Sequence, residues 1–457
     1  MRSGMYALKL RFEVGCLLLL CWFVPISARE TPDTGDAVPA LTIDEAVRLA
    51  IANNRDLKIV ALQLDSSKEK LAVDKTRRLP STSSYFFVSQ SLTTLSFTIP
   101  AGTLGVYSAT GPIPAKNTPI SAPPGPTAFV TASISQPLLT LYKINLRVHG
   151  GELNVEQAAT NLLAERLDIV DQVRQVYYSV MQGENAVEAA KASIKQYEEL
   201  DRITLQYVSE KVALQSENLE VKAKLAEQEY SLLQFQDKVQ SGKETLNNLV
   251  GRDITIDFHT VQVTELSSIE EDLQAARAKA VAQNPQVKQA QIGILQAENQ
   301  RRQAKAQYMP DFNAAFHYLS PFGIDYLPTN FAGIGVELNW EPWDWNRRKH
   351  EVAEKTIGVE QSKLKLDETN SQVLIKVDNQ YRALHEARAA VLVAKAAQES
   401  AKEKLREVTL QYQKKTALLR DVLQQESSLE SANSSYNEAM AEFWIAKANF
   451  MKAIGEE

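Results

Sequence analysis

The sequence is an internal duplication, and this feature constrains the fold more than any other. In each half, a helix-forming stretch leads through a proline into an insert, and a second proline leads into a long proline-free tract. Segments recur in the same order at offsets of 230 and then 204 to 205 residues, which indicates two copies of one architectural unit. The recurring segments are residues 46–54 and 276–284, Pro80 and Pro310, residues 204–207 and 409–412, and Gly251 and Gly455.

The two proline-free tracts, residues 138–284 and 343–457, predict long helices. Both are rich in Ala, Leu, Gln, Glu and Lys, which are strong helix formers. Apolar residues recur there at the i, i+4, i+8 and i+11 spacing of a packed helix face, for example Val373, Val377, Tyr381 and Leu384. A helix over residues 145–207 would be about 95 Å long at 1.5 Å per residue. Such a length suits a duct better than a compact enzyme.

The proline-rich inserts predict β-strands, because apolar residues alternate there with polar or small residues at period 2. Each insert carries one hairpin of strands of about nine or ten residues, the length that crosses a bilayer when tilted. The predicted strands are residues 82–92, 127–136, 311–319 and 330–341. The predicted junctions between helix and strand are Pro80, Pro137, Pro310 and Pro342.

Four strands per chain are too few to close a barrel. An open sheet edge in lipid would leave backbone groups without hydrogen-bond partners. We therefore expect several chains to share one barrel, either two chains with eight strands or three chains with twelve. The predicted fold class is mainly α with a β-barrel part.

The N-terminus predicts export. Basic residues precede an apolar run, and Ile26-Ser27-Ala28 offers a small-residue cleavage site, so residues 1–28 read as a signal peptide. Both cysteines lie inside it and match a lipidation site poorly, so we expect no lipid anchor. Without residues 1–28 the formal charge changes from −6 to −8, because three basic groups and one acidic group are lost. This mildly acidic charge argues against nucleic acid as a partner.

The expected domain plan follows from the duplication. After the signal peptide come a linker, the first repeat, a second linker and the second repeat; each repeat holds a helix, a β-hairpin and a long helical hairpin. The expected ranges are 29–40 for the first linker, 41–251 for the first repeat (β-hairpin about 81–136, helical hairpin about 145–250), 252–271 for the second linker, and 272–457 for the second repeat (β-hairpin about 311–341, helical hairpin about 347–454).

Three of the five tryptophans, Trp340, Trp343 and Trp345, fall within six residues at the end of the last predicted strand. Tyr142 occupies a comparable place in the first half. Because Trp and Tyr favour the interface between hydrocarbon and water, we predict an aromatic girdle at the inner membrane face, with the basic run 347–349 beyond it in water. The alternative is a small aromatic core at the junction of strand and helix.

Catalysis is not predicted. The five histidines are scattered without a metal-binding pair, and the glycine and serine patterns of nucleotide-binding or hydrolytic sites are missing. We therefore expect no enzyme activity, no cofactor and no metal site. An exported structural coiled-coil scaffold without channel activity is the alternative function, but it leaves paired strands of membrane length unexplained.

The stretches LTIDEAVRLAIANN (41–54) and YQKKTALLRDVLQQESSLESANSSYNEA (412–439), with the duplicated plan, resemble the TolC-type outer membrane efflux protein family. The resemblance runs from Leu41 to the end. It implies a homotrimer in the bacterial outer membrane, in which four transmembrane strands per chain contribute to a shared trimeric β-barrel and the long antiparallel helical hairpins form an α-barrel through the periplasm. It also implies an outer membrane lipid environment, a periplasmic adaptor and an inner-membrane pump as partners, as in tripartite efflux or type I secretion. The cargo, whether drug, metal ion, metabolite or polypeptide, is not fixed by the sequence.

The resemblance places a gate at the tips of the helical hairpins, near residues 208–214 and 413–417. In the family, acidic residues in the stretch corresponding to LLRDVL line the constriction, which here names Asp421, with Glu217 and Glu220 as first-repeat counterparts. Three copies of each would form anionic rings that favour cations. Tyr412 is expected to donate to Glu217 across the mouth; ordinary solvated surface charge is the alternative.

The tips also depart from the family. Relatives usually have a glycine three residues after the tyrosine, where this chain has Glu210 and Lys415. Many relatives have a basic residue four before the acidic one, where this chain has Ala417. Since glycine adopts positive φ at low cost, we expect the local turn and its closure to differ.

Overall fold

The computed structural model describes residues 39–263, 272–324 and 329–456. The expected signal peptide and residues 29–38 and 264–271 of the expected linkers lie outside the described residues. Helices dominate the described chain, as the sequence predicts. The helices are α1 (Ile43–Asn53), α2 (Arg55–Thr76), α3 (Leu141–Ser209), α4 (Gln215–Leu249), α5 (Leu273–Gln283), α6 (Pro285–Ala306), α7 (Arg347–Gln413) and α8 (Leu419–Ile454).

Each half begins with two helices where the sequence analysis expected one. The break falls at Asn54 between α1 and α2, and at Asn284 between α5 and α6. The Asn54 side chain accepts a hydrogen bond from the Leu57 N–H (3.0 Å) and donates to the Leu249 carbonyl (2.9 Å). Asn284 likewise caps α6 and donates to the Ala453 carbonyl (3.1 Å). Each asparagine therefore caps one helix and ties it to the last helix of its own half.

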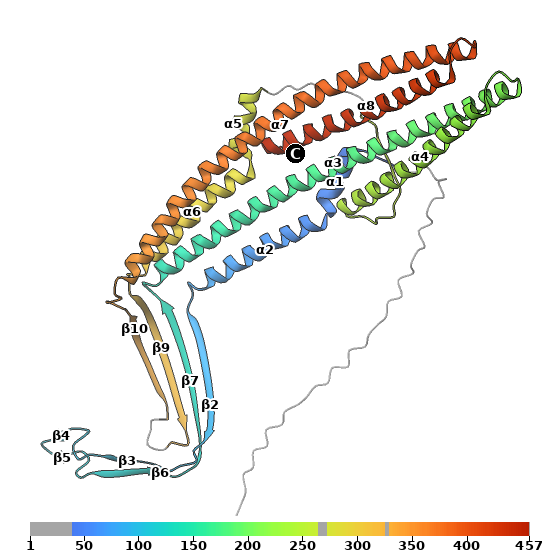
Figure 1. The fold of residues 1–457 in the computed structure, drawn as a ribbon. Helices are drawn as coiled ribbons and strands as arrows, with labels where there is room; N and C mark the ends of the chain where they lie inside the picture. The colour runs from blue at the N-terminus through green and yellow to red at the C-terminus, as the bar shows by residue number, and fades with distance from the viewer. Residues whose placement is uncertain (1–38, 264–271, 325–328, 457) are drawn as a thin grey trace, which may run out of the picture. The chain divides into compact units, whose positions relative to one another are not determined.

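The long helices pair as two antiparallel hairpins, α3 with α4 and α7 with α8 (Figure 1). Helix α2 packs along the first part of α3, and α6 packs against both α7 and α3. The main apolar core lies where these helices meet, and Tyr177, Leu246, Val377 and Phe443 are fully buried in it. Among the described residues, no helix combines the length and the apolar character needed to cross a membrane.

The sheet joins the two halves of the duplication. Its order is β10-β9-β7-β2, and every neighbouring pair is antiparallel. Pairing of β7 with β9 connects the hairpin of the first half to that of the second, with Ala132 opposite Tyr318. Strands β2 and β10 are the edges within the described chain. The bounds are β2 (Ser81–Gln90), β7 (Pro126–Pro137), β9 (Asp311–Phe322) and β10 (Phe331–Asn339).

The segment between the two predicted strands of the first insert, residues 93–126, contains two small ladders. Strands of two to five residues are too short to reveal a period of 2, so their alternation could not be read from the sequence. A further two-residue parallel pair joins the N-terminal end of the described chain to the segment after α4. These short strands are β3 (Leu95–Ile99) with β6 (Thr118–Ala122), β4 (Val106–Tyr107) with β5 (Gly111–Pro112), and β1 (Ala40–Leu41) with β8 (His259–Thr260).

Candidate functional site

The four-stranded sheet has one apolar face. In the register of the ladder, Ile334 lies opposite Phe316, and Phe316 lies opposite Ile134. Alternate residues along all four strands share this face, and none of them is charged. Ile334 is 87 % exposed and Val336 is 67 % exposed, so the described chain leaves the face uncovered. Its larger apolar members are Phe86, Val88, Val130, Ile134, Phe312, Phe316, Tyr318, Ile334, Val336 and Leu338.

The opposite face carries the charged and most of the polar side chains of the sheet, together with Tyr85, Phe87, Phe129, Leu319 and Phe331. Ser83 and Ser133 hydrogen-bond across β2 and β7 with their hydroxyl oxygens 2.8 Å apart, and Ser89 does so with Thr127 at 2.9 Å. The carboxylate of Glu337 stands on this face as well. A sheet whose charged groups all stand on one face, with an uncharged and mainly apolar second face, can separate hydrocarbon from water, and a transmembrane barrel requires that separation.

The tryptophan segment follows β10 and precedes α7. Trp340, Trp343 and Trp345 are 57 %, 71 % and 84 % exposed, and the rings of Trp343 and Trp345 meet edge to face with centroids 5.8 Å apart. Tyr142, in the first turn of α3, is 49 % exposed. The described chain therefore does not bury these side chains in a junction core, which leaves them available to an interface.

Arg348 corrects one expectation about the basic run. It was expected in water beyond the girdle, yet it is only 8 % exposed. Its guanidinium donates to the Glu341 carbonyl (2.6 Å) and carboxylate (2.8 Å), and it lies 3.4 Å from the Asp344 carboxylate, which caps the start of α7 by accepting from the Arg348 N–H (3.1 Å). The arginine thus clamps the segment between strand and helix. Trp345 and Asn346 hold positive φ within that segment (55° and 65°).

The four junction prolines lie at or beside strand ends. Pro80 and Pro310 directly precede β2 and β9, Pro137 is the last residue of β7, and Pro342 lies in the segment after β10. An ion pair also connects a junction of the first half with a junction of the second half. Lys143, in the first turn of α3, forms an ion pair with Asp311 at the start of β9 (2.8 Å).

The hairpin tips are residues 210–214 and 414–418, close to the ranges expected. In each tip a lysine, Lys211 or Lys415, takes the positive φ (61° and 62°) that glycine normally supplies. The N–H of the following residue then bonds five residues back, from Thr416 to Gln411 in the second tip (2.9 Å). Of the two positions where relatives have glycine, Lys415 is the residue with positive φ in the second tip. In the first tip the residue with positive φ is Lys211, one position after Glu210.

The two tips contact each other within one chain. The Tyr207 hydroxyl donates to the Gln413 carbonyl (3.4 Å), and its ring lies against Tyr412 with centroids 5.6 Å apart. Lys415 reaches back to the first tip, where its Nζ lies 3.5 Å from the Glu210 carboxylate and 5.1 Å from the centre of the Tyr207 ring. We call these contacts of Tyr207 and Lys415 the tip link.

The predicted gate residues occupy different environments. Tyr412 is 5 % exposed, and its hydroxyl has no hydrogen-bond partner in the described chain, so the expected bond to Glu217 is wrong for a single chain. Burial, and then the nearby charge of Glu217 and the hydroxyl of Tyr207, raise the pKa of Tyr412 to about 12. Glu217 is half-buried and Glu220 is exposed.

Asp421 has a structural role at the start of α8. Its carboxylate accepts a hydrogen bond from the Leu418 N–H (3.2 Å) and lies 3.6 Å from the Arg420 guanidinium. The carboxylate thus stabilises the first turn of the helix. Within the described ranges, no group of three or more His, Cys, Asp or Glu side chains is placed to hold a metal ion.

Sequence reasoning missed a buried polar cluster just above the tips. Asn218 is fully buried, and its amide donates to the Asp201 carboxylate (2.7 Å) and the Thr204 hydroxyl (3.1 Å). It also missed Glu426 of α8, which is only 6 % exposed. The available signal would be a single polar residue on a mostly apolar helix face. In the sequence, however, Asn218 and Glu426 each stand among other polar residues, from which neither can be distinguished.

Comparison with known proteins identifies the fold. The chain aligns with a membrane protein from Pseudomonas aeruginosa at 14 % identity (TM-score 0.75, covering 92 % of this chain and 91 % of that chain). It aligns with the outer membrane protein VceC from Vibrio cholerae at 15 % identity (TM-score 0.73, 91 % and 96 %) and with the outer membrane channel CmeC from Campylobacter jejuni at 15 % identity (TM-score 0.75, 90 % and 85 %). Among curated proteins, none matches the sequence significantly.

The sequence itself matches a family. The family described as outer membrane efflux protein matches residues 46–252 and again residues 276–456. These two matches coincide with the two halves of the duplication and cover most of the chain. The chain therefore belongs to the outer membrane efflux protein family.

Proposed function

We propose that three copies of the chain form an exit duct in the bacterial outer membrane. The duct conducts substrates passively from a periplasmic tunnel to the cell exterior, as part of a tripartite efflux or type I secretion system. A periplasmic adaptor and an inner-membrane pump deliver the substrate, and the helical hairpin tips close the periplasmic mouth. The observation that carries this proposal is the two-faced sheet with two unpaired edges.

The unpaired edges favour a barrel built from several chains. Strand β2 pairs only with β7, and β10 only with β9, within the described chain. An edge row of N–H and C=O groups has no partner in lipid, whereas β10 of one chain beside β2 of the next would pair both rows. Three chains give twelve strands and an open lumen, whereas eight strands would be filled by their own side chains.

The two faces of the sheet set its orientation in such a barrel. The apolar face would meet lipid, and the face with Ser83, Ser133 and Glu337 would line a wet lumen. The exposed aromatic residues, Tyr142 and the tryptophan segment, would form the girdle at the inner membrane face. Figure 1 shows this segment between the sheet and α7.

Ion conductance tests this function. Full-length protein purified in detergent and added to a planar lipid bilayer should produce stepwise conductance. A cationic blocker that binds at the hairpin tips should reduce this conductance when it is added to one side of the bilayer but not to the other. Protein that binds bilayers without conducting at any voltage would support the scaffold instead. The scaffold reading leaves the large exposed apolar face without a purpose, because soluble proteins rarely expose such patches.

The tip link is the proposed closing contact. Changing Tyr207→Phe together with Lys415→Ala removes the hydroxyl donated to Gln413 and the ion pair with Glu210. We expect this double variant to raise the open probability of the reconstituted duct several-fold, because three copies of the link are lost at once. Single-channel recording measures the change.

A matched control uses Tyr230→Phe with Lys414→Ala. Lys414 carries the same charge in the same tip, and Tyr230 is exposed on α4 away from the link. This control should conduct like the parent protein. Equal effects of the two double variants would remove the tip link from the gating scheme.

A further inference from the structure

Glu426 occupies the contact between the two helical hairpins. It lies on α8 where α8 packs against α3, and it is 6 % exposed. It borders two cavities at once, one of about 840 Å³ among α3, α4 and α8 and one of about 910 Å³ among α3, α7 and α8. Glu426 thus lines two spaces that are each large enough for water.

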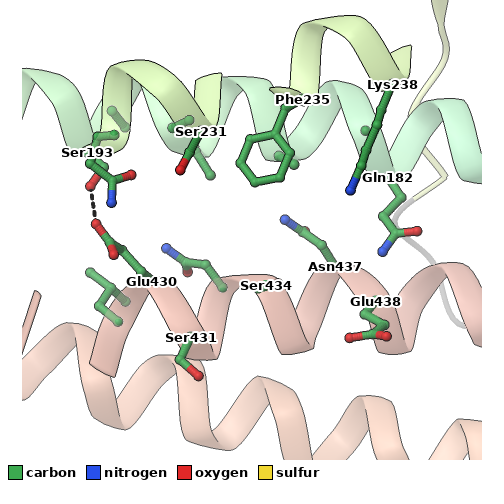
Figure 2. A pocket seen from close by; sticks show the side chains of 18 of the residues that line it. Gln182, Ser193, Ser231, Phe235, Lys238, Glu430, Ser431, Ser434, Asn437 and Glu438 are labelled. Carbon is green, nitrogen blue, oxygen red and sulfur yellow. Dashed lines mark hydrogen bonds between the residues drawn. The ribbon is translucent and has the colours of Figure 1, made fainter. Parts of the chain in front are cut away.

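Figure 2 shows the first cavity, in which α8 faces α3 and α4. Glu430 of α8 reaches across to α3, where the Ser193 hydroxyl donates to its carboxylate (2.6 Å). Phe235 and Lys238 of α4 point toward Asn437 of α8. The hydrogen bond drawn across the cavity is made by a carboxylate one helical turn from Glu426.

The Gln196 amide of α3 lies against the carboxyl group of Glu426. With its nitrogen toward the carboxyl group, Gln196 donates to both Glu426 oxygens, the longer bond being 3.1 Å. An ionised Glu426 accepts only that amide orientation, because it has no proton to donate. A neutral Glu426 also tolerates the reverse orientation, since its own O–H can donate to the amide oxygen.

No cation in the described chain forms an ion pair with Glu426. The charge that acts most strongly on it is that of Glu430, a like charge on the same helix. The other charged groups that line the two cavities are Lys195 and Glu199 of α3, Glu227 and Lys238 of α4, Glu399, Lys402 and Arg406 of α7, and Glu438 of α8. Three of them already have partners: Glu199 with Arg202, Glu227 with Lys224, and Arg406 with Glu403.

Burial, and then repulsion from Glu430, raise the pKa of Glu426 to about 7. The packed contact therefore binds a proton more tightly than a hydrated, separated carboxyl would. Raising the pH from the ordinary range of a glutamate through about 7 removes that proton and weakens the contact, whereas acidification strengthens it.

We propose that Glu426 is a proton-operated latch between the α3–α4 hairpin and the α7–α8 hairpin. When Glu426 is neutral, α8 packs against α3. When it is ionised, water enters from the two flanking cavities and the hairpins separate near the tips. The consequence for conduction rests on the proposed channel function, but the movement of the hairpins does not.

The test measures the separation of the hairpins directly. Full-length protein carries spin labels on Gln234→Cys of α4 and Gln424→Cys of α8, both exposed positions without charge. The label distance should increase between pH 5 and pH 8.5, with a midpoint no higher than about 7, the pKa of Glu426 in the packed contact. Glu426→Gln, which mimics the neutral group, should hold the short distance at every pH. Glu442→Gln, an exposed glutamate farther along α8, should behave like the parent.

Conductance gives a second readout. If the separated state has an ordinary glutamate pKa, linkage predicts that the ratio of open to closed states rises roughly tenfold between pH 6 and pH 8 for each latch. A label distance that does not change with pH, or that changes equally in Glu426→Gln, would overturn the latch. A pH-dependent distance in a protein that never conducts would uphold the latch and reject the channel.

Discussion

Changing Val336→Lys should prevent the chain from entering the outer membrane as a folded assembly. Val336 stands in the middle of β10 on the uncharged apolar face and is 67 % exposed in the single chain. A lysine on the lipid side of a barrel strand costs about 2–4 kcal/mol near the bilayer midplane. Three chains would carry this cost at once. The yield of folded trimer in isolated outer membranes measures the effect.

Gly335→Lys is the matched control. It adds the same charge at the neighbouring residue, whose side chain would point to the polar face, and a Cβ there has open space around it. We expect this variant to assemble and to alter only the ion selectivity of the lumen. Equal loss of trimer in both variants would mean that β10 does not present one face to lipid.

Changing Gly183→Leu should force α3 and α4 apart. A Cβ at Gly183 would lie 2.7 Å from Val239 Cγ2, and a Cβ at Gly242 would lie 2.7 Å from Val180 Cγ2, so the two helices approach through reciprocal glycine–valine contacts. Overpacking of such a contact costs about 1–3 kcal/mol. Chemical denaturation followed by circular dichroism should show this loss in the free energy of unfolding.

Gly358→Leu tests whether the effect comes from packing. Gly358 lies inside α7, and a Cβ there meets nothing within 4 Å. Replacing a helix-interior glycine at an open site should stabilise the helix by about 0.5–1 kcal/mol. The two leucine variants should therefore have opposite signs. A loss of stability of similar size in Gly358→Leu would refute the close α3–α4 approach as the cause.

The regular elements could be predicted because each shows its own period over many residues. The i, i+4 spacing of Val373 and Val377 reappears as two buried positions of α7, at 2 % and 0 % exposure. The breaks at Asn54 and Asn284 could not be predicted, because each depends on a hydrogen bond to a carbonyl far away in the sequence. The carbonyl bound by Asn54 is 195 residues away, and the one bound by Asn284 is 169 residues away. The sequence around an asparagine in a helical pattern does not indicate such a distant partner.

The site was less accessible to sequence reasoning for a related reason. Arg348 and Lys349 are equivalent in a basic run, yet only Arg348 is buried, because Glu341 and Asp344 happen to flank it in space. Glu426 is one glutamate among many on α8, and its burial depends on α3. The resemblance to the family located the tips, but only the backbone dihedral angles identify Lys211 and Lys415 as the residues that form the turns.

The protein mass of the particle extracted from membranes tests the central claim most directly. Light scattering with the detergent contribution subtracted should give three copies of the chain, in a particle that leaves the membrane only with detergent. That result would establish the shared barrel required by the unpaired edges of β2 and β10. A monomer or dimer that remains soluble without detergent would contradict the duct and favour the structural scaffold.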